Sequence, residues 1–374
     1  MDRIFESLPE TIETLVISRP SNPFTDPFTD DGSCYGNNTP PPMSIGRLSQ
    51  LKSLHVDSAL NAHSIREILA KCGSLERLQL QTRTGFDMSV IAEALRKYCP
   101  LVYEFNVSGP CPAFSERDWI KLLEASVGGW RTLSFHSMPF TLPMLDTVLG
   151  CAATLENLLV DTLPSLSSKD IQRLLCSAPK LKRLSLLPDE KSLYKTPACL
   201  DAEDMMRSKW ACCDTLESLK LAIRKVPRPD LVKRTNSRPF TETEKDAHRR
   251  NFPTISERTV YDQLSKLKSL RELVLGVEEK ANVRNHEHYN MERIVEGEYY
   301  DRNHSQYKLQ YDCLGMSLET GMDMLKDLKE MRCLGVDKMA VNFDRAEEQA
   351  WVKVNWPKFD QVADDFWETR DRMK

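Results

Sequence analysis

One short apolar pattern recurs along the sequence and constrains its fold more than any other feature. In "LERLQL" (75–80) the first, fourth and sixth residues are apolar, and similar runs begin near residue 12 and continue past residue 270. The fourth residues of these runs are Leu15, Leu54, Leu78, Phe105, Leu133, Leu158, Leu184, Leu219, Leu273 and, in a degenerate tenth run (328–333), Met331. From Leu54 to Leu184 the steps between them are 24, 27, 28, 25 and 26 residues, and later steps lengthen to 35, 54 and 58.

A step of about 20–29 residues with this L-x-x-L-x-L pattern is typical of leucine-rich repeats. Alternate residues of a short strand point to one side and must be apolar if that side is the core. The segments 64–72 and 88–99, which lie between runs, carry apolar residues at helical spacing. One strand and one helix cannot bury both apolar faces alone, whereas stacked copies can. We therefore predict a single α/β leucine-rich-repeat solenoid over 1–374, with about ten repeats, a curved parallel sheet on its concave face and helices on its convex face.

Cysteines recur three to five residues before several runs, at the ends of the predicted helices. A small, apolar, polarizable thiol suits the tight turn from helix back to strand, so we expect packed core thiols. Metal ligation is disfavoured because no C-x-x-C pair has a second pair at zinc-site spacing. The cysteines at this place are Cys72, Cys99, Cys151 and Cys176, with Cys212 and Cys213 in a similar position.

Composition indicates the cellular compartment and the classes of partner to expect, but not an activity. The net charge of −4 gives no global attraction to nucleic acid or to an anionic membrane. No apolar run approaches the roughly 20 residues that span a bilayer. The sequence has eleven cysteines and no targeting segment, so reduced thiols in the cytoplasm or the nucleus are expected rather than a disulfide framework.

Four of the runs with their preceding cysteines carry a resemblance to a known family. They are "KCGSLERLQL", "KYCPLVYEFNV", "CSAPKLKRLSL" and "CCDTLESLKL". They resemble the cysteine-containing, ribonuclease-inhibitor-like (RNI-like) repeats of F-box proteins. The long insertions, with "LSKLKSLRELVLGVEE" and a terminal "WVKVNWPKF", are similar to the F-box/leucine-rich-repeat families of filamentous and early-branching fungi. The resemblance implies an F-box that docks a Skp-type adaptor of a cullin–RING ubiquitin ligase, and repeats that recruit a target for ubiquitylation.

The sequence departs from that family at its first run. Residues 12–17 form a strand pattern, and the eleven residues before them are too few for an F-box. We therefore expect a protein–protein interaction module, the substrate-recognition repeats of an F-box-like ubiquitin-ligase receptor that lacks its own F-box. The alternative is a ligase-independent leucine-rich-repeat scaffold. Expected partners are protein targets, together with a Skp-type adaptor and a cullin–RING ligase if another protein supplies an F-box; membrane and nucleic acid are not expected.

Three long insertions and a C-terminal cap interrupt or close the repeats. Residues 18–43 are rich in Pro, Asn and Thr and are expected to be disordered, because they cannot bury enough apolar surface to offset the entropy of ordering. The insertion 225–257 is basic, 278–312 has mixed charge, and 344–374 is the expected cap. The insertions follow a strand and precede a helix, which would place them on one rim as a recognition surface. The alternative is that repeat junctions simply tolerate length, because loop-closure entropy grows slowly.

The residues that alternate with the inward ones line the exposed face of the sheet, the surface that solenoids commonly use for partners. The alternative for each is a solvated strand position. The candidate partner-binding residues are His55, Arg77, Gln79, Glu104, Asn106, Asn157, Arg183 and Lys220, and the same set includes Ser53, Thr132, Ser134, Leu159, Ser185, Ser218, Glu272 and Val274.

The catalytic motifs that we sought are not present in the sequence. There is no G-x-x-x-x-G-K-[ST], G-x-G-x-x-G or G-x-S-x-G pattern. The "HEH" at 286–288 lacks the i, i+4 histidine pair of a zinc helix. We therefore expect no enzyme, no catalytic residue, no cofactor and no metal site.

Overall fold

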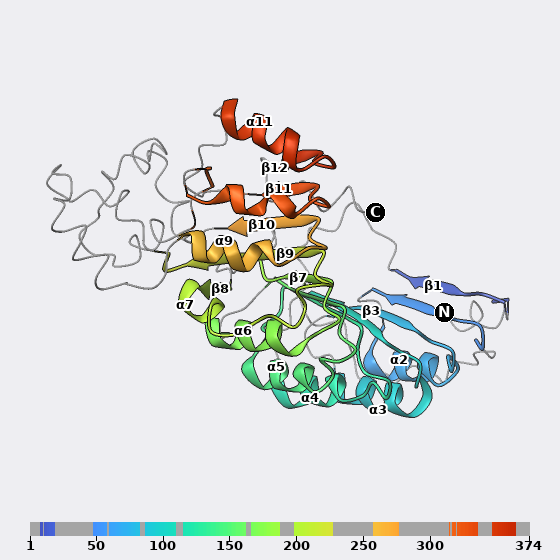
Figure 1. The fold of residues 1–374 in the computed structure, drawn as a ribbon. Coiled ribbons are helices and arrows are strands. Elements are labelled where there is room, and N and C mark those ends of the chain that lie inside the picture. Colours follow the sequence, from blue (N-terminus) through green and yellow to red (C-terminus); the bar gives the residue numbers. More distant parts are fainter. Residues whose placement is uncertain are drawn as a thin grey trace, which may run out of the picture. The chain divides into compact units, whose positions relative to one another are not determined.

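The computed structural model is an α/β structure in which parallel strands alternate with helices (Figure 1). It describes residues 8–9, 11–18, 48–57, 60–82, 87–109, 115–161, 166–187, 198–226, 257–276, 314, 316–318, 320–335 and 346–363. The predicted fold class, an α/β leucine-rich-repeat solenoid, is confirmed. The protein divides into two compact units, the first comprising Met1–Met138 and Asp146–Cys151, the second Pro139–Leu145 and Ala152–Lys374.

The first unit contains a parallel sheet whose strands follow one another in sequence order. The strands are β1 (Thr14–Ile17), β2 (Ser53–Val56), β3 (Arg77–Gln81), β4 (Glu104–Ser108) and β5 (Thr132–His136). The intervening helices are α2 (Ala62–Leu69), α3 (Met88–Tyr98) and α4 (Glu116–Leu123). These three helices pack side by side on one face of the sheet (Figure 1). Helix α5 (Leu142–Leu149) contributes residues to both units.

The second unit repeats the arrangement with more irregular spacing. Its parallel strands are β6 (Asn157–Val160), β7 (Arg183–Ser185), β9 (Ser218–Arg224), β10 (Glu272–Gly276), β11 (Cys333–Gly335) and β12 (Gln361–Ala363). The short strand β8 (Cys199–Asp201) pairs with the last residues of β9. The helices are α6 (Ser168–Ser177), α7 (Ala202–Met205), α9 (Glu257–Ser265), the 3₁₀ helix η3 (Met322–Asp327) and α11 (Ala346–Asn355).

The register of the sheet confirms the repeat frame for nine of the ten predicted runs. In the first unit Leu15, Leu54, Leu78, Phe105 and Leu133 stand opposite one another in successive strands. In the second unit the same holds for Leu158, Leu184, Leu219 and Leu273. Each of these side chains is at most 9% exposed, as the alternation of a half-buried strand requires.

The frame predicted for the tenth run is wrong by three residues. Leu334, not Met331, pairs with Leu273, so Met331 takes the first apolar position of its repeat. Both residues are fully buried, and an apolar run that offers candidates three residues apart fits either frame. Strand β8 lies outside the predicted runs, and β12 lies within the segment 344–374 that we expected to be a cap. The predicted insertions at 18–43, 225–257 and 278–312 lie almost wholly outside the described residues, as does 364–374 of the cap.

Large aromatic side chains fill the core of the first unit. Phe105 on β4 lies 6.4 Å from Trp119 on α4 and 5.9 Å from Trp130, measured between ring centroids. The indole N–H of Trp130 donates to the carbonyl of Leu123 at 2.6 Å. That carbonyl belongs to the last turn of α4, where backbone acceptors lack partners within the helix. One buried residue thus fills the core and also satisfies the end of a helix.

Of the six cysteines predicted to be packed core thiols, four are buried and two, Cys151 and Cys176, are half-buried; no described cysteine forms a disulfide. Cys72 is fully buried, and its thiol donates to the carbonyl of Ile68 at 3.1 Å. Cys99 donates to Leu69 and Cys72, and Cys212 to Leu175, across to the preceding repeat. These carbonyls lie at or just after the ends of helices. Cys176 differs because it lies inside α6, half-buried, and accepts from Gln172.

The residues that directly precede strands β1–β5 in the first unit, and β6, β7, β9, β10 and β11 in the second, form a row that we call the edge ladder. In the first unit it comprises Glu13, Lys52, Glu76, Tyr103 and Arg131, and in the second Glu156, Lys182, Glu217, Arg271 and Arg332. In each unit the backbone carbonyl of one member accepts N–H groups from the next member and from the residue that follows it. The side chains also interact from repeat to repeat, with Lys52 Nζ 3.1 Å from Glu13 Oε1 and Arg131 stacked 5.0 Å above the Tyr103 ring.

Candidate protein-interaction surface

We call the face of each unit's sheet that lies opposite the helices its open face. The open face of the first unit carries two rows of side chains. Parallel register places one row across the strands at their first open position and a second row two residues later. The charged row is Thr14, Ser53, Arg77, Glu104 and Thr132, and the amide row is Val16, His55, Gln79, Asn106 and Ser134. Five of the eight predicted partner-binding residues therefore lie together in these two rows.

The side chains at the centre of the amide row have unused hydrogen-bonding capacity. His55, Gln79 and Asn106 are half-buried, and none of their side chains forms a hydrogen bond to another described residue. Each side-chain amide offers a carbonyl acceptor and two N–H donors. In the charged row, Arg77 and Glu104 stand opposite each other without an ion pair between these two described residues. The two rows therefore present polar groups to whatever covers this face.

The end of the amide row is more enclosed. Ser134 is 4% exposed, which contradicts the expectation that it lines an exposed surface. Its Oγ lies 2.7 Å from Nε2 of His136, the next open-face residue on β5. Residues two positions apart on a strand point to the same face, so Ser134 and His136 can form a hydrogen bond with each other. This pair thus completes the polar contacts of Ser134 within its own strand.

The open face of the second unit differs because its central polar groups are already paired. Glu272 is 2% exposed, and its carboxylate lies 2.6 Å from Lys220 Nζ and accepts from Ser218 Oγ at 2.6 Å. Ser218 is 7% and Val274 1% exposed, so the expected solvent exposure of these three residues is wrong. The predicted binding residue Lys220 is committed to this ion pair. Of the remaining predicted residues, Arg183 is exposed and Asn157 half-buried.

The buried carboxylate also affects the neighbouring thiol on β11. Cys333 stands opposite Glu272 in the sheet and is 8% exposed. Burial, followed by the negative charge of Glu272, raises the pKa of Cys333 to about 11, while the ammonium of Lys220 lowers it. At neutral pH this thiol is protonated, so it is a poor nucleophile and a poor metal ligand.

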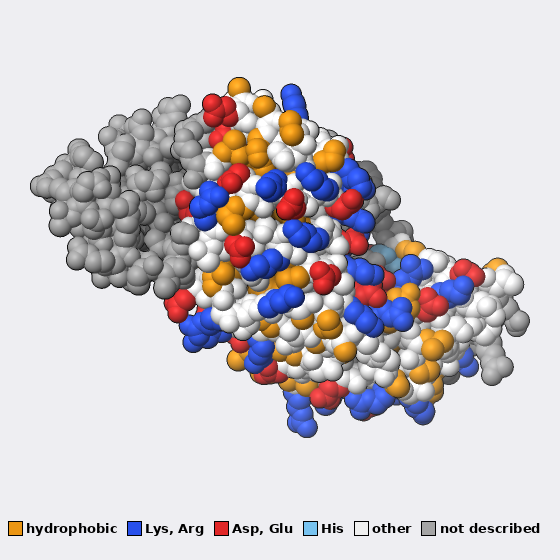
Figure 2. Space-filling view, viewed as in Figure 1, with side chains coloured by type: hydrophobic (Ala, Val, Ile, Leu, Met, Phe, Trp, Pro, Cys, Tyr) orange, Lys and Arg blue, Asp and Glu red, His pale blue; other side chains and the backbone are white. Residues whose placement is uncertain are grey.

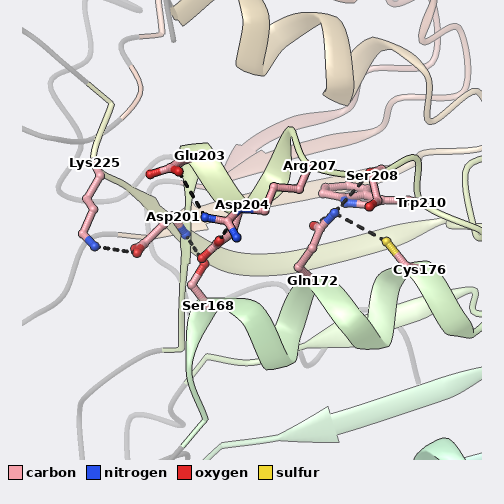
Figure 3. A network of polar contacts seen from close by, with 10 residues as sticks. All are labelled: Ser168, Gln172, Cys176, Asp201, Glu203, Asp204, Arg207, Ser208, Trp210 and Lys225. Carbon is pink, nitrogen blue, oxygen red and sulfur yellow. Dashed lines mark hydrogen bonds and ion pairs between the residues drawn. The ribbon is translucent and has the colours of Figure 1, made fainter. Parts of the chain in front are cut away.

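A second polar cluster, which the sequence did not predict, fixes the start of α7 (Figure 3). The carboxylate of Asp201 lies 2.5 Å from Arg224 Nε and 2.7 Å from Lys225 Nζ, and its backbone N–H donates to Ser168 Oγ at 2.7 Å. Lys225 adopts a φ of 57°, in the left-handed region. Asp201 therefore ties β8 to both the end of β9 and the first turn of α6.

The same cluster continues along α6 to a buried tryptophan (Figure 3). Gln172 accepts from the Trp210 indole at 2.8 Å and donates to the carbonyl of Ser208 at 3.1 Å. Asp204 is 5% exposed and pairs with Arg207. Arg207 also lies 3.1 Å from Glu203, so the cluster holds three acids and three cations. Because these charges balance, its contacts stabilise the segment between β7 and β9 rather than attract a charged ligand. A sequence signal for it exists only in retrospect, as an acid at 201 and the basic pair at 224–225.

The outer surface carries basic and acidic side chains in close alternation, with small apolar groups between them (Figure 2). Among the described residues, no three His, Cys, Asp or Glu side chains are grouped so as to hold a metal ion. In the same described part of the protein, no helix is both long and apolar enough to cross a membrane.

No protein-family model matches the sequence, and no curated protein matches it. The resemblance to F-box repeats therefore remains a hypothesis that depends on the runs and their cysteines.

Proposed function

We propose that the protein is a protein-recognition module that binds its partner through the open face of its sheet. The observation that supports this most directly is the centre of the amide row, where the half-buried side chains of His55, Gln79 and Asn106 have no hydrogen-bonding partner among the described residues. Extended sheet faces of repeat proteins are suited to large partners, because each strand adds one more contact position at a fixed spacing.

The leading form of this proposal is target recognition for a ubiquitin ligase. It depends on the resemblance to the RNI-like repeats of fungal F-box proteins. In that form the protein acts in the cytoplasm or the nucleus, where the ligases of that family work.

The second form is a ligase-independent scaffold, and one structural observation favours it. Residues 14–17 of the first predicted run form strand β1, which pairs in parallel with β2. The F-box that the resemblance implies is a helical unit, and a strand in this place supports the scaffold form.

Affinity purification of the full-length protein from its native cells, with mass spectrometry of the bound proteins, tests the proposal. The wild type is compared with a variant carrying Arg77→Ala, Gln79→Ala and Asn106→Ala. The matched control carries Glu93→Ala, Arg96→Ala and Lys97→Ala, which alter exposed side chains on α3. Partners that depend on the open face should be lost from the first variant and retained by the second.

Equal recovery by a correctly folded open-face variant, judged by circular dichroism, would contradict the proposal. Among the proteins retained by the wild type and both variants, a Skp-type adaptor or a cullin would support the ligase form. Their absence, with open-face-dependent partners present, would support the scaffold form.

A further inference from the structure

We infer that the partner of the first-unit open face is an extended, uncharged stretch of polypeptide that crosses the strands and whose backbone is bound by Gln79 and Asn106. This inference rests on the proposed function and specifies the chemistry of its partner. It concerns the amide row of the first unit, because the second unit has its corresponding groups already paired.

The chemistry of the amide row matches that of a peptide backbone. Gln79 and Asn106 are neighbours in register, on adjacent strands about 4.8 Å apart. Each has a carbonyl oxygen and an NH₂ group, so each can accept from a backbone N–H and donate to a backbone carbonyl oxygen. Both are half-buried and lack a hydrogen-bonding partner among the described residues, so a bound backbone would complete contacts that are now left to water.

The charges of the two rows argue against other classes of partner. Among their ten residues Arg77 is the one permanent cation, and it stands opposite Glu104. Binding to nucleic acid draws on several Lys or Arg side chains that contact phosphates. A strongly acidic or strongly basic peptide would meet one favourable and one unfavourable charge. A segment that is neutral at its centre meets neither penalty and leaves Arg77 and Glu104 to contact its flanks.

The dimensions of the row set the length of the segment. The row runs from Val16 to Ser134 across five strands, and four spacings of about 4.8 Å give roughly 19 Å. An extended peptide at about 3.3 Å per residue covers this distance with about six residues. Val16 is 58% exposed and provides an apolar contact at one end of the row. We therefore expect an apolar residue in the part of the segment that lies over β1.

The second unit supplies the contrast that makes the inference specific. There Glu272 uses its carboxylate on Lys220 and Ser218 and is almost fully buried. A peptide backbone laid over these strands would find its potential donors and acceptors occupied.

Selection of random heptapeptides displayed on phage, with the full-length protein immobilised, tests this inference. Selected sequences should be low in charge at their centre, and the synthesised peptides should bind in solution by fluorescence polarisation. Gln79→Ala and Asn106→Ala should each weaken binding about threefold to tenfold, as expected for the loss of a neutral hydrogen bond. Glu93→Ala and Arg96→Ala, which alter exposed side chains on α3, should leave the affinity unchanged.

Contact with the peptide backbone is tested by replacing one central amide of the selected peptide with an ester. The ester lacks the N–H donor while its side chains are unchanged, so binding should fall by about threefold to tenfold. Loss of binding that follows Glu93→Ala or Arg96→Ala rather than the amide variants would overturn the inference, as would ester peptides that bind as well as the amides. Failure to enrich any heptapeptide over the bare support would also overturn it. The broader proposal of protein recognition is judged separately, by the co-purification experiment.

Discussion

Lys182 Nζ lies 2.7 Å from Glu156 Oε2, and these two residues hold the same position in neighbouring repeats. The next member of the edge ladder is Glu217, whose backbone N–H donates to the carbonyl of Lys182. Arg271 then lies 3.3 Å from Glu217. Charge therefore alternates over the first four members of this ladder, from Glu156 to Arg271, with Lys182 between two acids.

The variant Lys182→Glu tests how much this alternation contributes to the free energy of unfolding. It places three carboxylates in succession, so stability should fall by about 1 kcal/mol, near the upper end for exposed ion pairs. The side chains of Lys182 and Glu156 are 46% and 27% exposed, which limits the effect. Urea denaturation in low and high salt provides the measurement. The double variant Glu156→Lys, Lys182→Glu should regain part of the loss, and an unchanged effect of Lys182→Glu in high salt would contradict the electrostatic explanation.

The ion pair between Lys220 and Glu272 should respond far more strongly. Lys220→Ala leaves an almost fully buried carboxylate without its cation, which costs about 3–5 kcal/mol in comparable pairs. The double variant Lys220→Met, Glu272→Met removes both charges and should recover most of that loss. Chemical denaturation of the wild type and the two variants measures it. A single variant as stable as the wild type would mean that water reaches Glu272.

The strand positions could be predicted from the sequence, but the burial of their outward side chains could not. Glu104 and Glu272 occupy the same repeat position, yet the first is half-buried and the second 2% exposed. Periodicity fixes the face on which a residue lies, whereas burial on the open face depends on its neighbours. The burial of each glutamate depends on the third residue of the preceding strand. That residue is Lys220 on β9 for Glu272 and Gln79 on β3 for Glu104. That pairing becomes visible only once the register is known.

Insertions limited the prediction in a different way. The regular steps from Leu54 to Leu184 supported the correct frame, because each of these runs had neighbours at a nearly constant distance. Across the long insertion before η3 no such spacing was present, and the predicted Met331 proved wrong because Leu334 pairs with Leu273. Asp201 and its partners were not predicted because their sequence separation carries no periodic signal.

The cysteines at the turns should resist alkylation in the folded protein. Burial raises the pKa of the Cys72, Cys99 and Cys212 thiols to about 12, so almost none is thiolate at pH 8. Mass spectrometry of iodoacetamide-treated protein should find these residues unmodified in buffer and modified in urea. Cys176, which is half-buried, is the internal comparison and should react before Cys72, Cys99 and Cys212.

The same shifts predict the direction of the pH dependence of stability. The folded-state pKa of these thiols lies above the ordinary value of 9.0. Their contribution is therefore fully present below about pH 9 and is lost as pH rises toward 12, because unfolded thiols ionise first. Stability measured by urea denaturation at pH 8 and pH 10 should be lower at the higher pH. Replacing Cys72 and Cys99 by Ala should reduce that difference, and a difference of the same size in this variant would assign it to other groups.

Gly109 should tolerate no larger residue, because the backbone of the neighbouring repeat passes close to it. It follows β4 with a φ of 113°, and a Cβ at this position would overlap the carbonyl oxygen of Thr82. The same turn is fixed by the N–H of Thr82, which donates to the carbonyl of Ser108 at 2.8 Å. Gly109→Ala therefore combines an unfavourable backbone conformation with a clash against backbone, and we expect it to lower stability by about 2–4 kcal/mol. Gly128→Ala is the matched control, since a Cβ there meets nothing within 4 Å. Thermal and urea denaturation of both variants should show a large loss for the first and little change for the second, whereas equal stabilities would mean that the β4 turn relaxes freely.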